Sequence, residues 1–98
     1  SEVAASMKIA LAERFQRDVR ALTTTQRGAV FEVLLSLPRA VGDPHLHAGT
    51  GIRKLHPSGI REARLGLGLR LVFALEPDLL TLVRIGNHDE IRRYLKDL

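Results

Sequence analysis

The sequence contains no cysteine and no tryptophan, and aromatic residues make up only 4% of it. Without cysteine, the chain cannot form disulfides, thiolate zinc sites or iron–sulfur clusters, and it has no thiol nucleophile. Long apolar runs are also absent: the longest, Leu71–Leu75, is far shorter than the roughly 20 residues of a membrane-spanning helix, and Val33–Leu35 is shorter still. Because no secretory signal pattern is present either, we expect a cytoplasmic protein.

What remains is the composition of an ordinary folded domain. The chain has 98 residues, of which 45% are apolar and 27% are charged. Both fractions are close to the averages of soluble domains, which argues against disorder. A chain of this length fills one hydrophobic core, so we expect a single domain over residues 1–98.

The net charge of +4 is concentrated in residues 45–75, whereas the remainder of the chain is balanced. An anionic partner, most commonly a phosphate backbone, explains such a cluster. The alternative is that the cations only keep a leucine-rich domain in solution. The stretch contains one acid, Glu62, and five basic residues, which are Arg53, Lys54, Arg61, Arg64 and Arg70.

The first part of the chain shows one strand pattern and two helix patterns. Alternating apolar residues over 7–11 predict a short strand, and an apolar stripe over 12–22 predicts an amphipathic helix. Thr23 and Gln26 have the spacing of a capping box, so a second helix is expected to begin there. We expect that helix to end near Leu37, because Pro38 disfavours helical geometry in the residue before it.

The second part predicts three strands and a terminal helix. After a loop over 38–51, strands are expected over 60–65, 69–76 and 80–85 as an antiparallel meander. Ile91, Leu95 and Leu98 form the stripe of a last helix that we expect to pack on the core. The predicted fold class is α+β, an antiparallel sheet with a helical hairpin on one face, in the order β-α-α-β-β-β-α. The other sheet face is expected to be free and to carry Arg70 and Arg84. Which alternate residues of 60–65 face the core stays undetermined.

Two kinds of residue could carry chemistry. His88 lies between a predicted strand and a predicted helix, and an imidazole, with its usual pKa of about 6.5, suits general acid or base catalysis. The alternative is an exposed or helix-capping histidine. Arg70 could aim a guanidinium fork at a phosphate, or be a solvated strand residue. His45, His47 and His56 are too weak a pattern for a metal site, because cysteine is absent and only Asp43 is near.

Three segments resemble the RelE/ParE superfamily of toxins from type II toxin–antitoxin systems, and the RelE/YafQ-like mRNA interferases in particular. They are Ile52–Leu55, the run GLGLRLVF over 66–73, and the run LVRIGNHDEIRRYL over 82–95. The resemblance covers about residues 7–98. It implies a RelE-like fold, a cognate antitoxin as partner, and cleavage of mRNA, in many members within the ribosome, which would inhibit translation.

The resemblance also implies a reaction without metal or cofactor. A base removes the 2′-hydroxyl proton, the oxygen attacks the adjacent phosphate, and an acid protonates the leaving 5′-oxygen. Arg70 matches the arginine that contacts the scissile phosphate, His88 matches the proposed general acid, and Tyr94 matches a tyrosine that stacks on or orients a base. Arg64 lies near a strand position that is basic in relatives. We expect the other cations to bind RNA, namely Arg53, Lys54, Arg61 and Arg84.

Some features depart from the family pattern. The tandem lysines of RelE are missing from the second strand, so the general base is unassigned, and both Glu62 and a loop histidine are candidates. The segment 45–51 is also longer than is standard. Two rival functions stay open: a ParE-like toxin that inhibits DNA gyrase without catalysis, and a non-toxic member that only binds partners.

Overall fold

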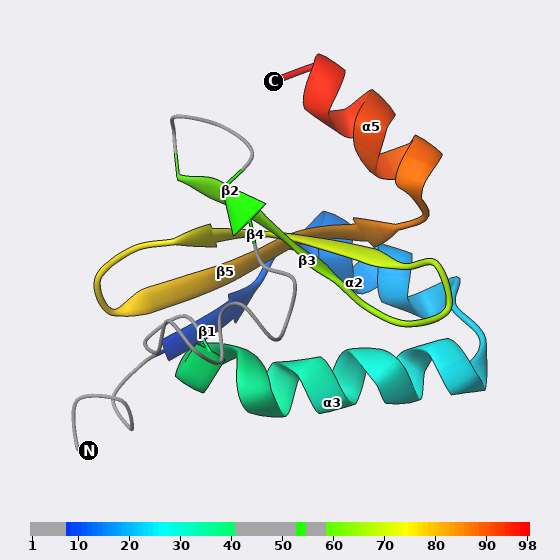
Figure 1. Cartoon of the computed structure of the whole chain (residues 1–98), viewed down its shortest axis with the longest axis horizontal. Helices are drawn as coiled ribbons and strands as arrows, with labels where there is room; N and C mark the ends of the chain where they lie inside the picture. The colour runs from blue at the N-terminus through cyan, green and yellow to red at the C-terminus, as the bar shows by residue number, and fades with distance from the viewer. Residues whose placement is uncertain (1–7, 41–52, 55–58) are drawn as a thin grey trace.

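The computed structural model describes residues 8–40, 53–54 and 59–98. Its elements follow the predicted order, with one additional two-residue strand (Figure 1). In chain order they are β1 (Lys8–Leu11), α2 (Glu13–Arg20), α3 (Thr24–Ala40), β2 (Arg53–Lys54), β3 (Ile60–Arg64), β4 (Arg70–Leu75), β5 (Leu79–Gly86) and α5 (His88–Lys96). The predicted α+β class is therefore confirmed.

The strands form one sheet in the order β1-β5-β4-β3-β2. The meander of β3, β4 and β5 is antiparallel, as predicted. The expectation of a wholly antiparallel sheet is wrong, because β1 pairs parallel to β5, with Lys8 opposite Leu79 and Leu11 opposite Leu82. In the described sheet, β4 lies between β3 and β5, and β2 covers the far side of β3. β1 therefore pairs with the far side of β5.

The junction between α2 and α3 has the predicted capping box. The backbone N–H of Gln26 donates to Thr23 Oγ1 at 3.1 Å, and the backbone N–H of Thr23 donates to Gln26 Oε1 at 2.9 Å. The predicted end of this helix near Leu37 is wrong, because α3 continues through Pro38 to Ala40. A proline within the last turn removes a single helical hydrogen bond, which the remainder of a 17-residue helix tolerates.

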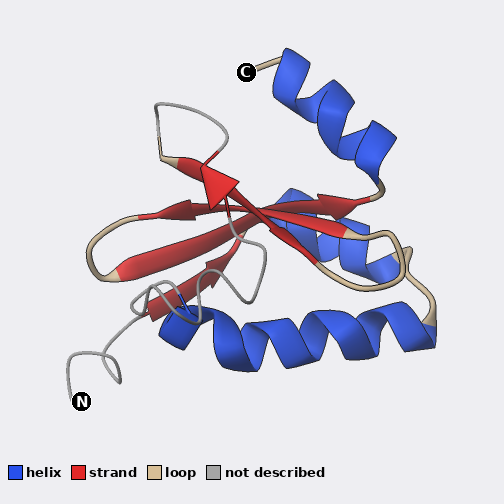
Figure 2. Cartoon of the chain, viewed as in Figure 1, coloured by secondary structure: helices blue, strands red, loops and turns tan. Residues whose placement is uncertain are grey.

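The main core lies between the sheet and the pair α2 and α3, which cover one face together (Figure 2). The phase of β3, which the sequence left open, is settled by burial: Ala63 and Leu65 belong to this core. Glu62 and Arg64 therefore project from the opposite side of the strand. Arg70 also lies on that side, because its neighbours Leu69 and Leu71 are core residues.

We call that opposite side the outer face, and it is not free as expected. Helix α5 crosses it (Figure 1), and Ile91 of the helix and Val72 of β4 are both fully buried there. Of the three residues predicted to pack, Ile91 is buried and Leu95 is half-buried. The prediction is wrong for Leu98, whose side chain is 53% exposed. Leu98 follows the last residue of α5, so its side chain is beyond the contact with the sheet.

Among the described residues, no helix is both long and apolar enough to cross a membrane.

Candidate nucleic-acid site on the outer face

An ion pair joins two neighbouring strands on the outer face. Arg70 Nη1 of β4 donates to Glu62 Oε1 of β3 at 2.9 Å. The Glu62 side chain is only 3% exposed, whereas the Arg70 side chain is 24% exposed. Arg70 therefore keeps part of its side chain accessible, and the buried carboxylate holds the guanidinium in place.

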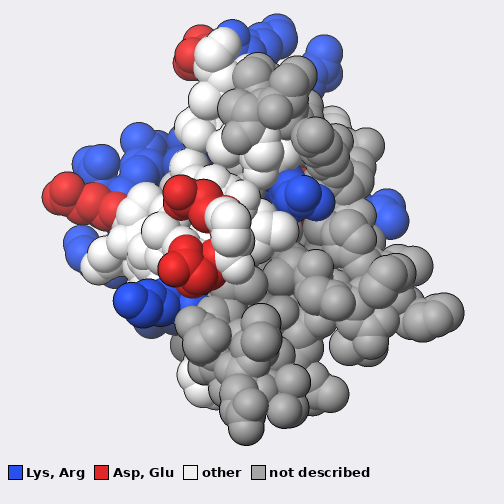
Figure 3. All heavy atoms as spheres, turned by 90° about the vertical axis from the view of Figure 1, so that its left-hand side faces the viewer, with Lys and Arg blue, Asp and Glu red and all other residues white. Residues whose placement is uncertain are grey.

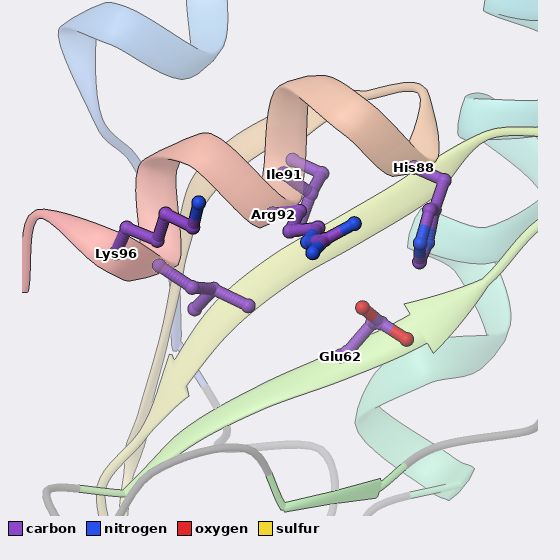
Figure 4. Close-up of a pocket in the computed structure, with 6 residues that line it drawn as sticks. Glu62, His88, Ile91, Arg92 and Lys96 are labelled. Carbon is purple, nitrogen blue, oxygen red and sulfur yellow. The ribbon is translucent and has the colours of Figure 1, made fainter.

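A hollow of about 330 Å³ lies between α5 and this part of the sheet. The carboxylate of Glu62 points from β3 toward α5, and the ring of His88 extends toward the same space (Figure 4). Two further cations come from the exposed side of α5. The complete lining is Glu62, His88, Ile91, Arg92, Leu95 and Lys96. The hollow thus combines an apolar wall with one acid, one imidazole and two fixed positive charges.

The start of α5 is held by a second capping box, which positions His88 as the first residue of the helix. The Asn87 side chain accepts from the backbone N–H of Glu90 at 2.9 Å, and Glu90 Oε1 accepts from the backbone N–H of Asn87 at 2.9 Å. Gly86 makes this possible, because a Cβ atom there would lie 2.9 Å from Glu90 Oε1. The cap fixes the backbone at His88 against the end of β5.

Arg84 has a different environment from Arg70. Its Nε donates to Asp18 Oδ2 of α2 at 2.8 Å, and its guanidinium carbon lies 5.5 Å from the ring centroid of Tyr94. The backbone N–H of Ile85 donates to the same carboxylate oxygen at 3.0 Å. Arg84 therefore links β5, α2 and α5, and its side chain is only 13% exposed. Tyr94 lies over Arg84 and is not part of the hollow's lining.

The other predicted cations are distributed over β2 and β3. Arg64 is exposed and pairs across the strands with Arg70. Arg61 lies on the core side of β3, where its Nε is buried without a hydrogen-bond partner among the described residues. Arg53 and Lys54 form β2, which pairs with β3. RNA binding by these residues stays a prediction.

The candidate loop histidines His45, His47 and His56 lie outside the described residues. Within the described part of the chain, no group of three His, Cys, Asp or Glu residues is arranged to hold a metal ion.

Figure 3 shows how charges are distributed on one side of the molecule. Lys and Arg side chains gather at the upper end and along the left flank, and acidic side chains lie between them (Figure 3). The positive charge is therefore divided between separate regions of this side.

Sequence reasoning missed two residues of the site, Arg92 and Lys96. Their spacing from His88 is four and eight residues, which places all three on one side of a helix. That spacing was visible in the sequence. It was not used because the outer face was expected to be free, so no helix side was assigned to it.

Comparison with known proteins supports the fold. No protein-family model matches the chain, and no curated protein matches it. Solved structures do match: the Escherichia coli DinJ-YafQ toxin–antitoxin complex has a TM-score of 0.70 and 21% identity, covering 88% of this chain and 97% of that chain.

Two further structures show the same similarity. The RelE-RelB complex of Pyrococcus horikoshii has a TM-score of 0.68 and 14% identity, covering 84% of this chain and 94% of that chain. A copper-bound mutant toxin of Helicobacter pylori has a TM-score of 0.61 and 24% identity, covering 87% of this chain and 98% of that chain. The chain therefore has the RelE-like toxin fold, as its sequence motifs indicated.

Proposed function

We propose that this protein is the toxin of a toxin–antitoxin pair and acts as a metal-independent endoribonuclease that cleaves mRNA and so inhibits translation. The observation that carries the proposal is that Glu62 and His88 line one hollow with two more cations, while Arg70 pairs with Glu62 from the neighbouring strand. The structures of similar fold, which include toxin–antitoxin complexes, support an antitoxin as the protein partner.

The proposed reaction uses the three groups in different roles. Glu62 takes the proton from the 2′-hydroxyl, and that oxygen attacks the adjacent phosphorus. The exposed part of the Arg70 guanidinium stabilises the additional negative charge on the phosphate oxygens. Protonated His88 then donates its proton to the leaving 5′-oxygen. The products are a 2′,3′-cyclic phosphate and a new 5′-hydroxyl. The protons and bonds of this step balance without a metal or cofactor.

The remaining cations would hold the RNA strand near these groups. Arg92 and Lys96 lie along the wall of the hollow, and Arg64 extends the positive charge across β3. Fixed cations that touch phosphates orient a strand without reading its sequence. Tyr94 could stack on a base only from outside the hollow, beside Arg84.

The first prediction concerns Arg70 and His88. Arg70→Ala and His88→Ala should each lower the rate of RNA cleavage by about 10²- to 10⁴-fold, because one removes charge stabilisation and the other removes the proton donor. Arg70→Lys should restore little, because an ammonium lacks the guanidinium fork. The measurement is cleavage of a labelled mRNA in the presence of a chelator, with and without ribosomes.

Arg93→Ala is the matched control, because Arg93 is exposed on α5 and does not line the hollow. It should cleave at the rate of the unmodified protein, and circular dichroism should show that all variants are folded. Cleavage at full rate by the folded Arg70 and His88 variants would refute the proposal. Intact mRNA together with inhibition of DNA gyrase would instead support the ParE-like function.

A further inference from the structure

The end of β5 contains a β-bulge shortly before the chain reaches the hollow. Leu82 of β5 pairs with Phe73 of β4. Arg84 pairs with Val72, the preceding residue of β4, so Val83 is an additional residue of β5. Strict alternation from Leu82 would place Arg84 in the main core, but the additional residue turns it to the outer face. Bulges often redirect side chains beside active sites.

Asp18 of α2 holds the two residues that follow the bulge. Its Oδ2 atom accepts from Arg84 Nε at 2.8 Å and from the backbone N–H of Ile85 at 3.0 Å. β1 pairs with β5 only as far as Leu82, and α2 lies beside the remainder of the strand (Figure 1). The side chains of Asp18 and Arg84 are only 10% and 13% exposed, so solvent ions screen this pair less than a surface pair.

The same arginine contacts α5 through Tyr94. Its guanidinium carbon lies 5.5 Å from the centroid of the Tyr94 ring, which is within the range of a cation–π contact. The helical repeat places Tyr94 on one flank of the buried Ile91, and Arg92, which lines the hollow, on the other flank. The helix is therefore held at its start by the cap, on its buried side by Ile91 and on one flank by Arg84. These three attachments set its rotation.

We propose that Arg84, held by Asp18 and covered by Tyr94, is a positioning residue for the proposed ribonuclease site. It fixes the rotation of α5 and so the place from which His88 donates its proton. A displacement of about 1 Å in a catalytic group can lower a rate about 100-fold. The inference rests on the proposed function, and it gives Tyr94 a contact within the protein in place of stacking on a base.

The rival assignment is that Arg84 and Tyr94 contact RNA directly. Arg84 is poorly placed for this role, because its side chain is largely buried and its Nε donates to Asp18. The two assignments also differ in kinetics. The loss of a direct RNA contact weakens binding and raises KM, whereas the loss of a positioning contact lowers kcat.

The test measures kcat and KM for cleavage of a short labelled RNA. Arg84→Gln and Tyr94→Leu should each lower kcat by about 10- to 100-fold and change KM by less than about threefold. Tyr94→Phe keeps a ring over Arg84 and should retain nearly the full rate. Arg14→Gln is the matched control, because Arg14 also donates to Asp18, at 3.3 Å, but from a side chain that is 56% exposed. It should cleave at the rate of the unmodified protein.

The double variant Arg84→Gln/Tyr94→Leu tests whether the two residues act together. If Tyr94 acts through Arg84, the double variant should lose no more activity than the more damaging single variant, because the contact is already lost. Two independent contacts to RNA would instead multiply their effects.

A second measurement needs no RNA and separates this inference from the proposed function. Amide hydrogen exchange of the ¹⁵N-labelled full chain should show weaker protection of α5 in Arg84→Gln and Tyr94→Leu, and unchanged protection in Arg14→Gln. Circular dichroism checks that each variant is folded, and the Tyr94 variants decide if Arg84→Gln is not. No cleavage by the unmodified protein would refute the ribonuclease function, and the exchange of α5 would then decide whether Arg84 positions the helix.

Two results would overturn the positioning role. The first is a raised KM with an unchanged kcat in the folded variants, which would assign Arg84 and Tyr94 to RNA binding. The second is α5 protection in Arg84→Gln and Tyr94→Leu equal to that of the unmodified protein.

Discussion

Glu62 is the residue whose environment is least expected for its chemical type. It is a carboxylate with a side chain only 3% exposed, it accepts from Arg70, and it borders the hollow. A buried carboxylate beside a guanidinium can act in two ways in the proposed reaction. It can accept a proton from the substrate, or it can only hold Arg70 in place.

Glu62→Gln separates the two roles, because glutamine keeps an oxygen that can accept from Arg70 but cannot act as a base. We expect cleavage to fall by about 10²- to 10⁴-fold, as for the loss of a general base. The measurement is the single-turnover rate on a short RNA. Glu32→Gln, a change at an exposed glutamate of α3, should have no effect. If the Glu62 variant cleaved normally, the carboxylate would have only the positioning role.

At the scale of elements, the turn between β3 and β4 has an unfavourable residue at its tip. Leu67 and Gly68 both have positive φ angles, 66° and 75°. A turn with two successive positive φ angles suits Asn-Gly or Gly-Gly, because a left-handed leucine places its Cβ against the backbone. Leu67 is also 58% exposed, so packing does not compensate for this conformation.

Leu67→Asn should therefore stabilise the protein. Asparagine adopts positive φ more readily, so we expect a gain of about 0.5–1 kcal/mol and a rise in Tm of roughly 2–8 °C. Leu67→Ala is the control, since it removes the exposed side chain but keeps the same conformational cost. Equal Tm values for the asparagine and alanine variants would show that the backbone conformation is not the cause.

Helix α5 depends on Ile91 for its attachment to the outer face, where this side chain is 1% exposed. Ile91→Asp should lower the free energy of unfolding by at least about 2–3 kcal/mol, from lost apolar burial and the cost of burying a charge. For a domain of this size, Tm would fall by roughly 8–24 °C.

Leu98→Asp provides the comparison, because Leu98 is exposed beyond the end of α5. A surface change of this kind should alter stability by only about 0.5 kcal/mol. Thermal unfolding followed by circular dichroism measures both variants. Similar Tm values for the two would mean that α5 is not held by Ile91.

For the whole molecule, local pattern predicted most elements but not their long-range pairing. The capping box of Thr23 and Gln26 and the outward direction of Arg70 follow from spacing alone. The parallel pairing of β1 with β5 could not be predicted this way, because no local pattern states which distant strand is a neighbour. The continuation of α3 past Pro38 was also not predicted, because the residue before a proline usually departs from helical geometry.

The site shows the same division between local and distant information. His88 and Arg70 were predicted from the family motifs, whereas the general base was left unassigned, with Glu62 as one candidate, because the tandem lysines of RelE are missing. The side of the sheet on which Glu62 lies was also open, because neither side of β3 is cleanly apolar. Glu62 lines the hollow together with residues of α5, a helix that follows it by more than twenty residues. Arg92 and Lys96 were missed for the same reason, since their relevance depends on where α5 lies.

The pairing of β1 with β5 also governs when the molecule can be assembled. β1 comes first among the described elements, yet its partner strand is Leu79–Gly86, so the sheet cannot close until that late segment has been synthesised. The next element, α5, brings His88, Arg92 and Lys96 to the hollow. Contacts so distant in sequence form late in folding. A nascent chain therefore holds neither the complete sheet nor the complete hollow until this last part of the domain has been synthesised.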